Sequence, residues 1–166
     1  MVGTVAGVGI LLMGPVGAAT ADLRRDIEAK LVETQRKAAP DLTIGKATCP
    51  AALSKPAAKA VGVHRCIVIV EGVRVPYEVT VRNSALVKGG SYTLQNAKAV
   101  IDTKKLASIA ATAVDDPSKV KIMCGTARVV VVDPGTKVSC TVVDGVATDT
   151  LVFEVKDLQG TVSFVP

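Results

Sequence analysis

Hydrophobic residues follow two different periods along this chain, and the pair of periods occurs twice. Apolar side chains recur at three- and four-residue steps over residues 22–37 and again over 102–114. This is the period of an amphipathic helix. Each of these segments is followed by runs in which every second residue is apolar, which is typical of strands with one buried face. The pattern predicts a helix followed by a short antiparallel sheet, twice.

Turn residues divide the alternating runs into strands. The expected strands of the first half span 43–49, 65–70 and 73–82, and a further hairpin is expected to join 85–87 to 91–94. Those of the second half span 119–124, 128–132, 138–143, 150–156 and 160–165. Glu71-Gly72 lies between two alternating runs and marks a hairpin. Pro76 cannot donate to a sheet ladder, so an edge or bulge is expected there.

The cysteines repeat in the same way. They form two pairs of near-equal spacing, namely Cys49 with Cys66 and Cys124 with Cys140. The second cysteine of each pair precedes an apolar run, an acidic residue and a glycine, Glu71-Gly72 in one case and Asp144-Gly145 in the other. A tandem duplication explains this better than chance does. Four cysteines allow three pairings, and the duplication favours a disulfide within each half.

These patterns together predict an α+β protein of two tandem modules. Residues 22–95 form the first module and residues 96–166 the second, each with one helix packed on a small antiparallel sheet. Modules of this size need extra stabilisation. A disulfide closing a loop of this length contributes about 3 kcal/mol, a large share of such a module's stability.

The first 21 residues have the character of an export segment. Residues 2–19 carry no charge, and Ala19-Thr20-Ala21 offers a cleavage site between small residues. We therefore expect a cleaved signal peptide. The alternative is an N-terminal membrane anchor, although the apolar run is short for a span and Gly14-Pro15 interrupts it. Both interpretations place the rest of the chain outside the cytoplasm, where disulfides persist.

Charge is distributed unequally between the two halves. The net charge is +5 and lies on the first module, since basic and acidic residues balance in the second. An anionic partner is therefore expected to prefer the first module. The candidate patch lies on its helix: Arg24, Arg25, Lys30, Arg36 and Lys37. The alternative is that a modest positive charge only keeps the protein soluble. No aromatic residues are interleaved with these cations, so nucleic-acid binding is not expected.

The sequence predicts no catalytic, cofactor or metal site. It contains no Cys-x-x-Cys motif, and the cysteines are too widely spaced for a usual four-cysteine zinc site. His64 is the only histidine and has no nucleophile in a catalytic context. We interpret it as a surface residue at a strand edge. The cysteines are therefore expected to be structural, and the protein is not expected to be an enzyme.

Two short motifs give the first half a resemblance to a known family. Thr48-Cys49-Pro50 follows the expected helix, and Val61-Gly62-Val-His-Arg-Cys66 precedes an alternating strand. The order resembles the secreted actinobacterial domain of unknown function numbered 4333. The resemblance covers about residues 22–95, with a weaker copy over 98–166 in which Gly125 replaces the proline. It implies an extracytoplasmic location and disulfide pairing, and brings no activity or catalytic residues.

The expected function is that of an exported, non-catalytic cell-envelope protein that binds another molecule. Its partner would be an envelope protein or a component of the wall or membrane, and residues 2–19 would supply any membrane association. The alternative is a proteinaceous inhibitor or clamp on a secreted enzyme. Interface hot spots are usually tryptophan, tyrosine or arginine. The chain has no tryptophan and two tyrosines, which disfavours a tight inhibitor.

Overall fold

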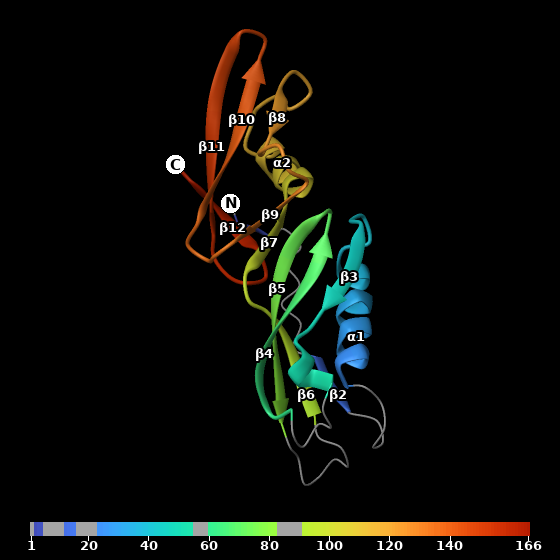
Figure 1. Ribbon diagram of the computed structural model, residues 1–166. Helices are drawn as coiled ribbons and strands as arrows, with labels where there is room; N and C mark the ends of the chain where they lie inside the picture. Colours follow the sequence, from blue (N-terminus) through green and yellow to red (C-terminus); the bar gives the residue numbers. More distant parts are fainter. Residues whose placement is uncertain (1, 5–11, 16–22, 55–59, 83–90) are drawn as a thin grey trace. The chain divides into compact units, whose positions relative to one another are not determined.

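The computed structural model describes residues 2–4, 12–15, 23–54, 60–82 and 91–166 (Figure 1). The fold is α+β, and its sheets are antiparallel. The chain divides into two compact units. Gly9–Ala97 form one, called here the α1 unit, and Lys98–Pro166 with Met1–Val8 form the other, called the α2 unit.

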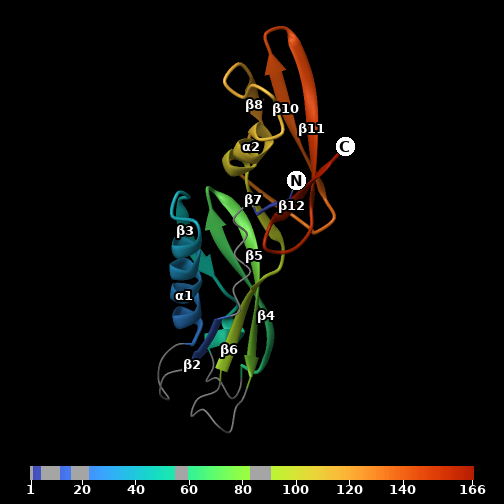
Figure 2. The same ribbon diagram turned by 180° about the vertical axis from the view of Figure 1, so that it is seen from behind.

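The α1 unit consists of one helix and a five-stranded sheet. Its helix is α1 (Leu23–Ala38), and a 3-10 turn, η1 (Ala51–Ser54), follows the third strand of the chain. The strands are β2 (Leu12–Pro15), β3 (Ile44–Thr48), β4 (Gly62–Val70), β5 (Val73–Arg82) and β6 (Ser91–Asn96). Their order across the sheet is β2-β6-β5-β4-β3, so β2 and β3 form its edges. Figures 1 and 2 show α1 alongside β3.

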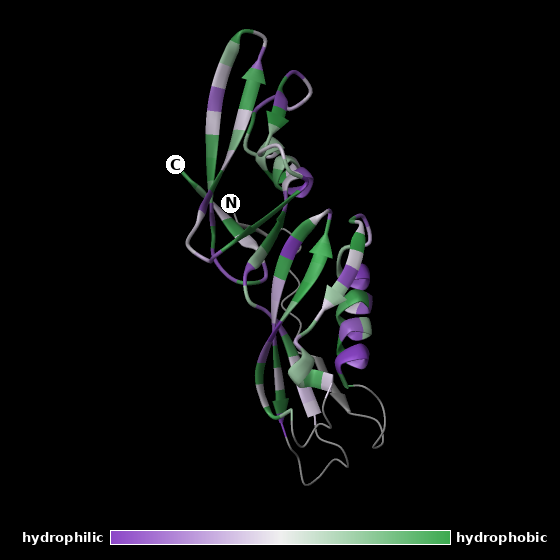
Figure 3. Ribbon diagram, in the orientation of Figure 1, coloured by the Kyte–Doolittle hydropathy of each residue, from purple (hydrophilic) through white to green (hydrophobic). Residues whose placement is uncertain are grey.

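The core of the α1 unit lies between one stripe of α1 and one face of the sheet. Leu23, Ile27 and Leu31 recur at four-residue steps and are buried. The opposing strands bury alternate residues, including Val68 and Val79. The outward side of α1 is hydrophilic (Figure 3). The helical and strand periods seen in the sequence therefore mark the two surfaces that meet.

A tight turn joins β4 to β5. Glu71 has φ 48° and Gly72 has φ 78°, and positive φ at both central residues defines a type I′ turn. Glycine adopts this conformation at little cost. Glu71 is stabilised in it by two hydrogen bonds to Thr43, the residue just before β3. The Glu71 N–H donates to the Thr43 carbonyl (2.9 Å), and the Thr43 N–H donates to Glu71 Oε1 (2.6 Å). The turn thus fixes the start of β3.

The α2 unit has a shorter helix, α2 (Thr103–Ala111), and two sheets. The larger sheet has the order β1-β12-β11-β10-β8, and the smaller pairs β7 with β9. The bounds are β1 (Val2–Thr4), β7 (Ala99–Asp102), β8 (Lys121–Met123), β9 (Val129–Val132), β10 (Lys137–Asp144), β11 (Ala147–Val155) and β12 (Thr161–Val165). Ile101, Leu106 and Phe153 are among the buried residues of its core.

Asp102 links β7 to α2. One carboxylate oxygen caps the helix by accepting from the N–H groups of Lys104 (2.9 Å) and Lys105 (3.2 Å). The other accepts from Arg128 (3.1 Å) in the segment just before β9. Asp102 is only 2% exposed, so these bonds satisfy a carboxylate that the fold removes from water.

Each unit contains one disulfide at the same place in its sheet. Thr48 pairs with Ile67 across β3 and β4, and the disulfide joins the next opposite positions, Cys49 and Cys66. In the α2 unit Met123 pairs with Thr141 across β8 and β10, and the disulfide again joins the next positions, Cys124 and Cys140. The pairing within each half, expected from the sequence, is confirmed.

Some sequence expectations differ from the structure in detail. The second helix ends at Ala111, three residues early, in a turn. Pro76 lies within β5, opposite Ile67 and just beyond the end of β6, where the sheet ladder does not need its missing N–H. β6 pairs with β5 rather than only closing a hairpin with 85–87, which lie outside the described residues.

The turn between β10 and β11 also differs from its sequence motif. Asp144 pairs with Ala147, so the turn consists of Gly145 and Val146 and not of Asp144-Gly145. Only Gly145 has positive φ (56°), as in a type II′ turn. The turn therefore begins five residues after Cys140, just as Glu71 lies five residues after Cys66.

Parts of the expected export segment pair with the sheets. Residues 2–4 form β1, which pairs with β12, and residues 12–15 form β2, which pairs with β6. The other residues of this segment lie outside the part of the chain that the structure describes, as does Asp22, the expected helix cap. Among the described helices, none combines the length and apolar composition needed to cross a bilayer.

Candidate functional site

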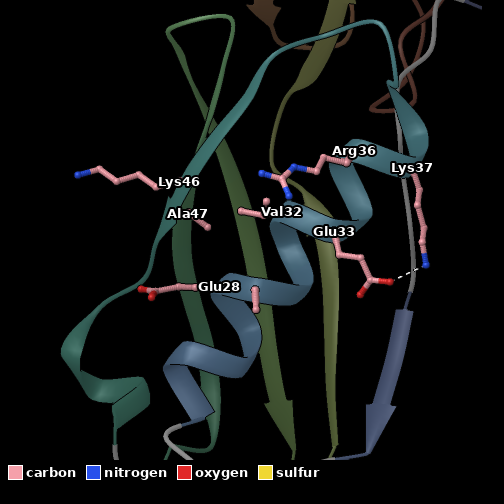
Figure 4. A pocket seen from close by; sticks show the side chains of 8 residues that line it. Glu28, Val32, Glu33, Arg36, Lys37, Lys46 and Ala47 are labelled. Atoms are coloured by element: carbon pink, nitrogen blue, oxygen red, sulfur yellow. Dashed lines mark hydrogen bonds and ion pairs between the residues drawn. The ribbon is translucent and has the colours of Figure 1, made fainter.

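An open groove of about 620 Å³ runs between α1 and β3 (Figure 4). Its lining consists of Glu28, Ala29, Val32, Glu33, Arg36 and Lys37 from α1, and Lys46 and Ala47 from β3. Three of these residues are apolar and five are charged. The groove therefore offers both an apolar floor and charged borders.

The helix contributes the residues next to its buried stripe. Ile27 and Leu31 face the sheet, so Glu28, Val32 and Arg36, at four-residue steps, follow the adjoining side of the helix toward β3. Figure 4 shows Val32 and Arg36 directed toward the strand. One face of α1 thus builds the core, and its flank builds one wall of the groove.

The strand contributes the other wall through a local irregularity. The register of β3 against β4 shifts between Ile44 and Ala47, which is a β-bulge. A Cβ at Gly45 would lie 3.1 Å from the Cβ of Ile69, so a glycine allows this close approach. The bulge places Lys46 on the exposed side, pointing away from α1, while Ala47 lies next to the groove (Figure 4).

Glu28 connects the two walls. Its carboxylate accepts a hydrogen bond from the backbone N–H of Cys49 (2.8 Å) and lies 3.9 Å from the Arg24 guanidinium. The carboxylate is about a quarter exposed, so both contacts are partly shielded from water. Glu28 therefore ties the helix to the end of β3, beside the disulfide.

Glu33 is neutralised by two lysines of its own helix. Lys37 and Lys30, at four- and three-residue steps, both donate to its carboxylate, Lys30 at 2.9 Å. The hydrogen bond from Lys37, then that from Lys30, lowers the pKa of Glu33 to about 2. This cluster is exposed, and its three charges compensate one another in part.

Two cations of the groove have no such compensation. Arg36 and Lys46 are exposed, and neither makes an ion pair or a side-chain hydrogen bond in the described part of the chain. They belong to opposite walls. The groove thus presents two uncompensated positive charges, with Ala29, Val32 and Ala47 lying beside them.

The candidate patch expected from the sequence is divided by these contacts. Arg24 lies near Glu28, and Lys30 and Lys37 bind Glu33. Arg25 also has a partner. Of the five cations, Arg36 and Lys37 line the groove, together with Lys46, which the sequence interpretation missed. Lys46 is the polar member of an alternating run, but the sequence alone does not place that run against α1.

Buried polar atoms form a second notable feature of the α1 unit. Tyr77 on β5 pairs with Asn96 on β6, and both are almost completely buried. The Tyr77 hydroxyl and the Asn96 amide make no hydrogen bonds within the described residues. Burial raises the pKa of the Tyr77 hydroxyl. These groups lie in the core, outside the groove.

The α2 unit has a smaller apolar hollow of about 240 Å³. Ile109 and Ala113 line it from the helix side, and Phe153 and Phe164 from the sheet. The two phenylalanine rings meet edge to face at 5.9 Å. No charged residue lines this hollow, so it lacks a group that would orient a ligand.

Two further polar side chains make local contacts. His64, on β4, lies 2.7 Å from the Ala60 carbonyl, to which Nε2 donates. Asp116 accepts from Ser118 (2.6 Å) and pairs with Lys119 (2.8 Å) in the turn after α2. Across the described ranges, no group of three or more histidine, cysteine, aspartate or glutamate side chains is arranged to hold a metal ion.

Comparison with known proteins identifies no relative of this chain. No family model, no curated protein and no solved structure matches the chain. The resemblance to the secreted domain family therefore stays a prediction. The groove and the two disulfides are the features of the molecule that bear on its function.

Proposed function

We propose that this is an exported, non-catalytic binding protein of the cell envelope, and that the groove between α1 and β3 is its binding surface. The observation that carries the proposal is the pair of uncompensated cations, Arg36 and Lys46, which border the groove on opposite walls beside Ala29, Val32 and Ala47. The two disulfides suggest an extracytoplasmic location. The charge of +5 supports an anionic partner.

We further propose that the two units derive from a tandem duplication. Two observations support it. The strand orders β6-β5-β4-β3 and β12-β11-β10-β8 correspond position by position. The disulfide and the turn that follows it also occupy equivalent positions in both. The resemblance to the actinobacterial domain family fits this organisation. A signal peptide at residues 1–21, or the alternative membrane anchor, would deliver both units to the same compartment.

Photo-cross-linking in intact cells tests the proposed function. A photoreactive amino acid replaces Lys46, and trapped partners are identified by mass spectrometry. Arg74, an exposed cation of β5 that does not line the groove, is the matched control. We expect partners at position 46 that are absent at position 74. A single secreted enzyme as partner would instead support the inhibitor or clamp. Equal labelling at both positions would contradict the proposal.

A further inference from the structure

The strand that forms one wall of the groove has an open side. β3 is the last strand of its sheet, so only β4 pairs with it. An edge strand presents unpaired N–H and C=O groups to which another extended chain can bind. Which residues present those groups follows from the register of the sheet.

The hairpin turn sets this register. A two-residue turn closes on a hydrogen-bonded pair, here Val70 with Val73, and hydrogen-bonded pairs then alternate along the strands. Cys66 with Tyr77 is therefore also such a pair, so the backbone groups of Cys66 point toward β5. Cys49 consequently faces Cys66 in a non-hydrogen-bonded pair, and their Cα distance of 4.3 Å agrees.

Because hydrogen-bonded and non-hydrogen-bonded pairs alternate along β3, the register also shows which of its backbone N–H and C=O groups point away from β4. The backbone of Thr48 points toward β4, whereas that of Ala47, like that of Cys49, points away from it. The Cys49 N–H confirms this direction, because it donates to Glu28 of α1 and not to β4. The Glu28 carboxylate thus occupies the position of a carbonyl from one further strand. Ala47, two residues earlier, has no corresponding acceptor from α1 in the described residues.

We propose that β3 binds an extended acidic peptide segment of a partner protein, which adds a strand beyond β3 and lies in the groove. This inference rests on the proposed function and names the class of partner. Ala47 would supply backbone hydrogen bonds to the peptide. Alternate side chains of an added strand point to opposite faces, so one set would contact Val32 and Ala29.

Charge selects an acidic segment. Glu33 is already bound by two lysines and Glu28 by Arg24 and Cys49, so neither carboxylate is available to a basic ligand. Arg36 and Lys46 have no such partners, so each can bind a carboxylate of the ligand. Arg36 would do so from α1, and Lys46 from β3. An anionic wall polymer would use the same two cations but would not pair with the backbone of Ala47. The backbone therefore distinguishes the two ligands.

The first experiment measures binding of a synthetic peptide in which pairs of glutamates flank a pair of valines, so that an added strand would present carboxylates both toward α1 and toward the exposed face that carries Lys46. Isothermal titration calorimetry compares the full chain with its R36E and K46E variants. We expect each reversal to weaken binding about tenfold, with a matching loss of salt dependence. R74E, an equal change of charge outside the groove, should bind as the original protein does. A lysine-valine peptide should not bind.

The second experiment tests strand pairing itself. Ala47→Pro removes only an N–H that points away from β4, and proline is tolerated in edge strands. We expect the disulfides and helical circular dichroism to remain, and peptide affinity to fall about five- to tenfold. Should A47P misfold, N-methylated peptides give the same answer on the original protein. Methylation of one alternating set of peptide amides should abolish binding, and methylation of the other should not.

The outcomes separate the inference from the proposed function. Equal binding of both methylated peptides would overturn strand addition. So would tight binding of polyphosphate that depends on Arg36 and Lys46 and displaces the peptide, since the site would then be one for polyanions. In either case, cross-linking at position 46 could still trap an envelope partner, and the proposed function would stand. Absence of that cross-link, with peptide binding intact, would refute the proposed function alone.

Discussion

The α1 and α2 units share one frame but differ in what is packed on it. Both have four strands in the same order, β6-β5-β4-β3 and β12-β11-β10-β8, and a disulfide directly across an antiparallel strand pair. Their helices differ, since α1 has 16 residues and α2 has 9. The first strand after the helix also differs, with 5 residues in β3 and 3 in β8. The shared strands and the disulfide build the sheet of each unit. The helix and the first strand after it differ between the units, and in the α1 unit these two elements line the groove.

This difference shows where a binding surface can arise on such a frame. A helix of 16 residues has enough turns to build the core with one stripe and to extend a flank along β3. In α2, which has 9 residues, the apolar residues Leu106 and Ala110 are buried in the core. The α2 unit adds the β7–β9 pair, which supplies Ile101 to that core. The longer helix therefore lets the α1 unit line a groove as well as a core.

Removal of each disulfide should give the largest effects. Replacing both cysteines of a pair with alanine opens a loop of 17 residues in the α1 unit or 16 in the α2 unit. Each change should lower the free energy of unfolding of its own unit by about 3 kcal/mol. The α2 unit has the shorter helix and should lose its cooperative transition, while the α1 unit should keep a weakened one.

Hydrogen exchange followed by mass spectrometry measures the two units separately in one chain. The C49A/C66A protein should exchange faster in β3 and β4, and the C124A/C140A protein throughout the α2 unit. Each variant serves as the control for the other. Loss of protection in both units from either pair would show that the units do not fold independently. Larger damage to the α1 unit would reverse the predicted order.

The cap of α2 should give the next largest effect. Asp102→Ala removes the acceptor for two helix N–H groups and the partner of Arg128, so we expect a loss of about 2 kcal/mol in the α2 unit. Asp102→Asn keeps an acceptor and should cost about half as much. Arg128→Ala isolates the ion pair. Urea denaturation followed by hydrogen exchange measures each value, and an equal cost for Ala and Asn would show that the cap contributes little.

A substitution at the positive-φ glycine of each hairpin turn should have a smaller effect. Gly72→Ala and Gly145→Ala each place a side chain on a residue with positive φ, 78° and 56°. An added Cβ meets no atom within 4 Å at either position, so the cost is that of the backbone alone, about 1 kcal/mol. Val146→Ala, at an exposed turn residue, is the control. Thermal unfolding measures all three, and the absence of a loss at either glycine would argue against the positive-φ conformation of that turn.

The sequence allowed the frame to be predicted because its signals are local. Helical periodicity located α1 and α2, and alternation located the paired strands. The repeated spacing of the cysteines indicated the disulfides. The acidic-glycine motif does not by itself locate the turn of the α2 unit, because it looks the same whether glycine is the first or the second turn residue. Gly145 takes the first position, and Gly72 the second.

The groove could not be predicted because it depends on contacts between distant segments. Glu28 accepts from Cys49, 21 residues away, and nothing near either residue signals that bond. Lys46 and Arg36 border the same groove although they belong to different elements, and nothing in the alternation signals the bulge that sets the register of β3. Charge counting identified a basic helix, but it could not show that two of its lysines bind the Glu33 carboxylate. Pairing of β7 with β9 likewise joins segments that the sequence leaves unrelated.

The Glu33 cluster offers the smallest and most local contrast between the units, since α2 has lysines in its first turn but no acidic residue at that step. The pKa of Glu33, about 2 against an ordinary 4.5, is lowered by its hydrogen bonds to Lys37 and Lys30. A depressed folded-state pKa contributes stability above pH 4.5 that is lost as the pH falls through about 2. Because Glu33 is fully exposed, the contribution should be small and should decline with added salt.

NMR titration of the Glu33 carboxyl carbon should show a midpoint near 2 in the original protein. The midpoint should move toward 4.5 in the K37M variant, and further in K30M/K37M. A midpoint that stays near 4.5 in the original protein would mean that both lysines are available to ligands, and the predicted selectivity of the groove would then have to include them.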